Sequence, residues 1–178
     1  MTDATWLDAR QQRTWRSFLQ VHGRLAGHLA RQLHADSGLS LADYEVLVAL
    51  TDTPDGLLRP FVLSQQLQWE QSRLSHHLRR MQGRGLVTRQ ECPSDGRGAF
   101  VVLTDEGRSA IEAAAPGHVA AVRDLFFADL DDAQVAALDE AMGAVLRRLD
   151  GDVTAQPCRE DASPVVPCGG TPADAAQA

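Results

Sequence analysis

The segment from Leu63 to Thr104, LSQQLQWEQSRLSHHLRRMQGRGLVTRQECPSDGRGAFVVLT, has the most informative pattern of the chain. Its central part, residues 71–84, places Leu74, Leu78 and Met81 at spacings of four and three residues. This spacing aligns one apolar stripe on a helix of about 3.6 residues per turn, and the stripe can be buried against another helix. At the start of the segment Leu63 and Leu67 lie four residues apart and predict a shorter helix that can be this partner. The segment therefore predicts a helix, a turn and a second helix.

The outward face of the second helix is basic. Between Gln71 and Arg89 the sequence holds five arginines and no acid, although the formal net charge of the chain is −7. A local concentration of cations on an acidic protein is expected of a surface that meets phosphate. Arginine and serine at the start of such a helix also suit the edges of bases. The alternative is a solvated, salt-bridged helix face, which the lack of acids within the run disfavours.

A hairpin with a polar tip follows the second helix. Gly85 stands where a helix would end in a left-handed cap. Leu86 to Thr88 begin an extended segment, and Ala99 to Thr104, rich in β-branched and apolar residues, return from it. Between them CPSDGRG has the composition of a hairpin tip, where Arg97 is placed to enter a minor groove and Asp95 to hold its guanidinium. The alternative is that this tip is a plain solvated turn. If the tip contacts DNA, the helices and the hairpin together form a winged helix-turn-helix.

The wing carries a specific resemblance. Asp95, Arg97, Val101, Leu103 and Thr104 form the pattern D-x-R-x-x-x-V-x-L-T, which is followed by Asp-Glu-Gly. This pattern is similar to the wing signature of the MarR family of bacterial transcriptional regulators, and the segment before it resembles the helix-turn-helix of that family. The resemblance extends over about residues 10 to 150. It implies a mainly α fold with a small β-wing.

Long amphipathic helices are predicted on both sides of the winged helix. Residues 8–34 carry a broad apolar face at helical spacing: Trp15, Phe18, Leu19, His22, Leu25, Leu29 and Leu33. Residues 105–149 are also expected to be helical, and their last part repeats apolar residues at 3, 4, 3 and 4 positions: Val135, Leu138, Met142, Val145 and Leu149. This is the spacing of a narrow seam between helices. Because the N-terminal helix of the resembling family helps to form its dimer, we expect a homodimer.

Residues 1–150 are expected to form a single domain, with the winged helix-turn-helix at 41–104. Ser40 is predicted to cap its first helix, Leu41 to Thr51. From residue 151 the composition changes to Pro, Gly, Ala and acids without periodicity, which predicts a disordered tail over 151–178.

Two helix boundaries are harder to predict from the sequence. Pro60 fits a first helical turn but Phe61 cannot cap one, so the start of the next helix stays open. Pro116 is expected to kink or break the helix that follows Thr104, because proline removes a backbone hydrogen bond.

Other classes of function find no support in the residues. The chain has neither a signal peptide nor an apolar run of membrane-spanning length, so we expect a cytoplasmic protein without a membrane partner. No nucleophile elbow, phosphate loop or H-E-x-x-H motif is present, so no enzyme and no cofactor are predicted. His22, His28 and His34 lie six residues apart and point to different sides of a helix, so no metal site is predicted.

The resemblance and the residues together predict a mode of binding to double-stranded DNA. A homodimer would present two such helices to successive major grooves of a pseudo-palindromic operator. The residues expected to read bases are Ser72, Arg73, Ser75 and His76, and those expected to bond phosphates are Arg79, Arg84 and Arg89. By analogy with the family, binding near a promoter blocks transcription and a small molecule relieves it.

A few residues are candidates for sensing a small molecule or an oxidant. The candidate ligand-binding residues are Trp15, His22 and Tyr44, for which a plain core role is the alternative. Cys92 lies beside arginines at the base of the wing, where a lowered thiol pKa would allow redox sensing, and an ordinary wing residue is the alternative. A winged helix can also serve as a protein-interaction module without DNA; a steep dependence of DNA binding on salt would distinguish the two.

Overall fold

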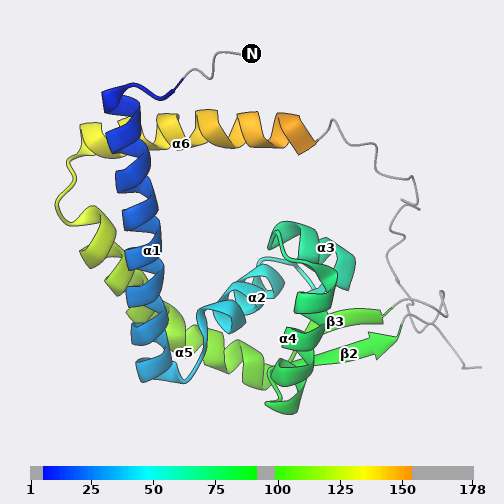
Figure 1. Cartoon of the computed structure of the whole chain (residues 1–178). Helices are drawn as coiled ribbons and strands as arrows, with labels where there is room; N and C mark the ends of the chain where they lie inside the picture. Colours follow the sequence, from blue (N-terminus) through cyan, green and yellow to red (C-terminus); the bar gives the residue numbers. More distant parts are fainter. Residues whose placement is uncertain (1–5, 92–98, 154–178) are drawn as a thin grey trace, which may run out of the picture. The chain divides into compact units, whose positions relative to one another are not determined.

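The computed structural model describes residues 6–91 and 99–153 (Figure 1). The chain divides into two compact units, Met1–Leu130 and Asp131–Ala178. The described residues are mainly helical, with a small three-stranded antiparallel sheet, which confirms the predicted fold class. The predicted tail was placed three residues too early, because a helix continues to Val153, and residues 154–178 lie outside the described residues.

Helix α1 spans Ala9–Ser37 and helix α2 spans Leu41–Thr51, close to the predicted bounds. The predicted cap at Ser40 is confirmed, because its hydroxyl accepts a hydrogen bond from the Asp43 amide at 3.1 Å. The Asp43 carboxylate in turn accepts from the Ser40 amide at 2.9 Å, which completes a capping box. The start of α2 is therefore set by two residues three positions apart.

Helices α3 and α4 form the helix-turn-helix. Helix α3 spans Pro60–Gln66 with proline in its first turn and no side-chain cap, so its open start is settled at Pro60. Helix α4 spans Gln71–Gly83, close to the predicted 71–84. Gly85 follows with a φ of 75°, the left-handed conformation that the sequence predicted after this helix.

Strands β2 (Val87–Glu91) and β3 (Ala99–Leu103) form the predicted hairpin, with Val87 opposite Leu103. A third strand, β1 (Leu57–Leu58), pairs with the other edge of β3 and was not predicted. Two residues are too short for a strand period to be recognised in the sequence. The hairpin tip, with Cys92, Asp95 and Arg97, lies outside the described residues.

Helix α5 spans Asp105–Val122 and is capped by Thr104, whose hydroxyl accepts from the Gly107 amide at 3.0 Å. A Cβ on Gly107 would overlap the carbonyl oxygen of Leu86, so this close approach requires glycine. Of the expected kink or break at Pro116, the break is wrong, because α5 continues through this residue alongside α1. The irregularity comes later, as a π-helical turn η1 at Arg123–Phe127.

The first unit has one hydrophobic core, to which α1, α2, α3, α4, α5 and the sheet contribute. Its fully buried side chains are Leu33, Leu39, Val46, Leu47, Leu50, Leu63, Leu74, Leu78, Met81 and Val101. The second unit contains α6, Asp132–Val153, on which Met142, Val145, Leu146 and Leu149 are exposed within this chain. None of the helices in the described ranges has the length and apolar content of a membrane span.

Candidate nucleic-acid interface

Helix α4 has the two faces that its sequence predicts. Leu74, Leu78 and Met81 are at most 1% exposed and pack into the core, so the opposite side of the helix is turned outward. Of the residues predicted to read bases, Ser72, Arg73 and His76 are exposed and Ser75 is half-buried. The basic face is therefore available on a helix whose other side is fixed by the core.

The turn before α4 holds an aromatic ring against the first arginine of this face. The Cζ atom of Arg73 lies 4.3 Å from the centroid of the Trp69 ring, a cation–π contact. The same ring meets His77 edge-on, with 5.4 Å between centroids and 88° between planes. Trp69 was not predicted as a site residue, although an aromatic residue four positions before Arg73 was a signal for this contact.

A buried carboxylate anchors α4 to α2. Asp43 is 3% exposed, and its Oδ2 accepts a hydrogen bond from Arg84 at 2.7 Å. His77 Nε2 lies 3.1 Å from Asp43 Oδ1, although its N–H is not well aligned with that oxygen. On its other side, His77 Nδ1 lies 2.8 Å from the Arg80 guanidinium. Since arginine can only donate, Nδ1 must accept, and the ring proton sits on Nε2 facing Asp43.

These contacts decide the charge of Asp43. Burial disfavours the carboxylate and would raise its pKa. The close approach of the His77 ring, together with the hydrogen bonds from Ser40 and Arg84, outweighs burial and holds the pKa of Asp43 well below its ordinary value of 3.8. The site is therefore a charged carboxylate enclosed by donors from both helices.

Arg84 is used within the protein. Besides Asp43, its guanidinium donates to the Gly38 carbonyl at 3.1 Å, while its side chain is 44% exposed. The sequence showed no acid near this arginine because its partner lies 41 residues away. Its contact with phosphate stays a prediction.

The base of the wing adds cations on other elements. Arg89 is exposed on β2, opposite Val101 of β3. Arg59, which was not predicted as a site residue, has its Cζ 5.0 Å from the Phe100 ring centroid. These arginines of α4, β2 and the start of α3 therefore belong to one part of the first unit, residues 41–104, which we call the helix-turn-helix lobe.

Comparison with known proteins agrees with this geometry. The family model described as "MarR family" matches residues 37–98. The transcriptional regulator HosA of Escherichia coli is 34% identical over 101 residues, which cover 57% of this chain and 73% of HosA. The chain belongs to the MarR family.

Two further relatives extend the match. The solved structure of Sco3205, a MarR family transcriptional regulator from Streptomyces coelicolor in complex with DNA, has a TM-score of 0.79 and 40% identity, covering 84% of this chain and 93% of that one. The HTH-type transcriptional repressor YetL of Bacillus subtilis is 26% identical over 112 residues, covering 63% of this chain and 66% of YetL. This MarR protein is a DNA-binding transcriptional regulator and not an enzyme.

The three predicted ligand residues of this MarR protein fall at two places. Trp15 and His22 are exposed on α1 and stack on Phe18, at 5.6 and 6.1 Å between ring centroids. Tyr44 is half-buried on α2 and meets His118 of α5 at 4.4 Å. His118 was missed, although it follows the buried Ile111 and Ala114 at helical spacing. Burial raises the pKa of Tyr44 and lowers the pKa of His118.

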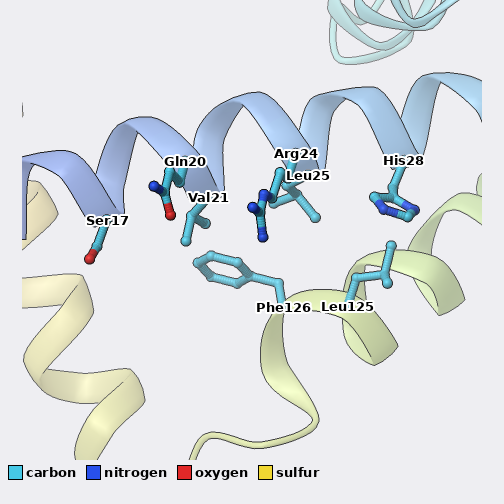
Figure 2. A pocket seen from close by; sticks show the side chains of 8 residues that line it. All are labelled: Ser17, Gln20, Val21, Arg24, Leu25, His28, Leu125 and Phe126. Atoms are coloured by element: carbon cyan, nitrogen blue, oxygen red, sulfur yellow. The ribbon is translucent and has the colours of Figure 1, made fainter.

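A groove of about 330 Å³ lies between α1 and η1. Figure 2 shows the ring of Phe126 directed towards the side of α1 that carries Val21 and Arg24. Its lining residues are Ser17, Gln20, Val21, Arg24, Leu25, His28, Leu125 and Phe126. Within the described ranges no three His, Cys, Asp or Glu side chains come together as a metal site.

Proposed function

We propose that this MarR protein is a homodimeric repressor that binds a pseudo-palindromic operator and is released by a small molecule. The observation that carries the proposal is the basic outer face of α4, held over a fully buried inner face. Sco3205, which is similar over most of the chain, has been solved with DNA, and YetL is a repressor. These likenesses support the DNA-bound repressor rather than a winged helix that contacts only protein.

The side chains of α4 divide by their place on the helix. Residues in its first turns reach base edges when such a helix enters the major groove. We therefore assign base contacts to Ser72, Arg73, Ser75 and His76. Arg79 and Arg89 are assigned to phosphates, and Arg97, with Asp95, to the adjacent minor groove.

A second copy of the chain would cover the apolar surfaces that one chain leaves open. On α1, Trp15, Phe18 and Leu19 are between 42% and 52% exposed, and on α6 Val145 and Leu149 are each 56% exposed. Large apolar side chains gathered on one face of an exposed helix mark an interaction site. A two-fold dimer would place two α4 helices about 34–36 Å apart, one turn of DNA.

Release by an effector follows from this geometry. Two helices that must match the spacing of successive grooves lose contacts in both half-sites when either helix shifts. A ligand that binds the shifted dimer more tightly would therefore empty the operator. Trp15, His22 and Tyr44 remain the predicted ligand residues, and the groove beside Arg24 and His28 is a second candidate place.

The test is selection of duplexes from a random DNA library by the full chain at near-physiological salt. We expect wild type to enrich an inverted repeat, Arg73→Ala to lose preference at one base pair of each half-site, and Arg97→Ala to bind all sequences more weakly. Loss of a bidentate arginine contact costs about 1–3 kcal/mol of discrimination. Arg123→Ala on η1, an exposed arginine away from α4, is the matched control.

Salt decides between DNA binding and the protein-interaction alternative. Binding through several arginine contacts should weaken steeply as salt rises, and each lost phosphate contact should lower the salt slope by about one. A folded wild-type dimer that enriches no sequence and binds DNA weakly would refute the repressor.

A further inference from the structure

Trp69 occupies a constrained place between α3 and α4. Its amide donates to the Ser64 carbonyl at 2.9 Å, and the preceding Gln68 has a φ of 53°, in the left-handed region. The side chain is half-buried and packs on the core of the first unit. Backbone and core together fix where the indole ring lies.

The ring joins Arg73 to the buried part of the lobe. One side of the contact is the Arg73 guanidinium over the ring at 4.3 Å, and the other is His77 at 5.4 Å. His77 is itself placed between Arg80 and Asp43. The position of the exposed arginine is therefore tied, through the ring, to a rigid buried group.

The contact with Trp69 leaves the donors of Arg73 available. A cation–π contact engages the charge of the guanidinium without using any of its N–H donors in a hydrogen bond. Among the described residues Arg73 has no hydrogen bond and no ion pair, unlike Arg80 and Arg84, which are engaged with His77 and Asp43. The N–H donors that can bond guanine are therefore free for DNA, while the contact with Trp69 orders the Arg73 side chain.

We propose that Trp69 is the positioning residue that makes Arg73 specific for guanine in each half-site. This inference rests on the proposed function of α4. An arginine that is already ordered loses less side-chain freedom on binding and reaches one base pair rather than several. Trp69 touches no base in this proposal; it acts through Arg73.

The experiment is a double-mutant cycle on the full-length dimer, with binding measured to the selected operator and to duplexes changed at each base pair in turn. Trp69→Leu, which keeps apolar bulk without a ring, is expected to lower affinity for the operator about two- to fivefold. The loss of discrimination between base pairs should be confined to the guanine position that Arg73 contacts. Trp69→Phe, which keeps a ring, should retain most of the preference.

The cycle separates positioning from simple loss of structure. In the Arg73→Ala background Trp69→Leu should have no further effect on base preference. With Arg79→Ala, an exposed arginine of the same helix, the two effects should add. Unfolding curves identify variants that remain folded, and if Trp69→Leu does not fold, Trp69→Met, which also lacks a ring, is taken through the same cycle.

Two results would overturn the inference. One is an equal loss of affinity for every duplex, and the other is a Trp69 effect that persists without Arg73. Failure of wild type to select any operator would instead refute the proposed function, so the two failures are distinguishable. A preference lost only at the guanine position, and only when Arg73 is present, would support the positioning role.

Discussion

The helix-turn-helix lobe and the long helices treat their apolar side chains in opposite ways. In the lobe Leu47, Leu63 and Met81 are 0% exposed. On α1 Trp15 is 52% exposed, and on α6 Leu149 is 56% exposed. Both groups follow amphipathic spacing in the sequence, yet only the first finds its partners within one chain.

The difference shows which part of the molecule is self-sufficient. The lobe encloses its own core and also pairs its buried acid, Asp43, with His77 and Arg84. The first half of α1 and the seam of α6 leave apolar surface that costs free energy in water. The helix-turn-helix lobe is thus complete within one chain, whereas the long helices need the second copy proposed above to cover their apolar side chains.

The largest effect is expected from opening the core of the lobe. Leu78→Ala, at a position 1% exposed, should lower the free energy of unfolding by about 2–5 kcal/mol, because it removes apolar contacts and leaves a cavity. Urea unfolding at a fixed protein concentration measures it. Phe61→Ala, 55% exposed in the same lobe, should change stability by only about 0.5 kcal/mol. Equal losses for the two would contradict the self-sufficient lobe.

Breaking the seam of α6 should act on assembly instead. Val145→Asp places a charge among the apolar seam residues and is expected to give folded monomers. Because two linked half-site contacts then become one, affinity for the operator should fall about 100-fold. Sedimentation gives the oligomeric state, and Ala144→Asp, off the seam on the same helix, is the control. A dimer that survives Val145→Asp would remove α6 from the interface.

The buried acid should give a smaller effect with a defined pH dependence. Asp43→Asn should lower the free energy of unfolding by about 1–3 kcal/mol near neutral pH. The contact with Arg84 should contribute the smaller part, because that side chain is partly exposed to water. The folded-state pKa of Asp43 is lowered, so its stabilisation is present above the unfolded pKa of about 3.9 and is lost as pH falls below it. The stability gap between wild type and variant should therefore narrow in acid.

Unfolding measured from neutral pH down to the acid range checks this narrowing. Asp52→Asn, at an exposed residue of the same lobe, should show no comparable gap at any pH. A gap for Asp43→Asn that stays constant or widens in acid would mean that the carboxylate is not the group at work.

Several features of the fold were predictable because their causes are local. The inward face of α4 followed from three apolar residues at helical spacing, and the start of α2 from a serine that can cap it. Strand β1 was missed because it is two residues long and exists only through its pairing with β3. The expected break at Pro116 failed because α5 is held along α1, where a Cβ at Gly117 would already touch Gln32 at 3.3 Å.

From the sequence alone came the helix-turn-helix, the wing hairpin, the cap at Ser40 and the basic outer face of α4, since these depend on residues within a few turns of one another. Tertiary structure decided which charges on that face are used internally. Arg84 meets Asp43 from 41 positions away, His77 turns inward to the same acid, and Trp69 holds Arg73. The physical reason is that a charge is neutralised by whatever lies within a few ångström of it, and that neighbour is chosen by how the helices pack.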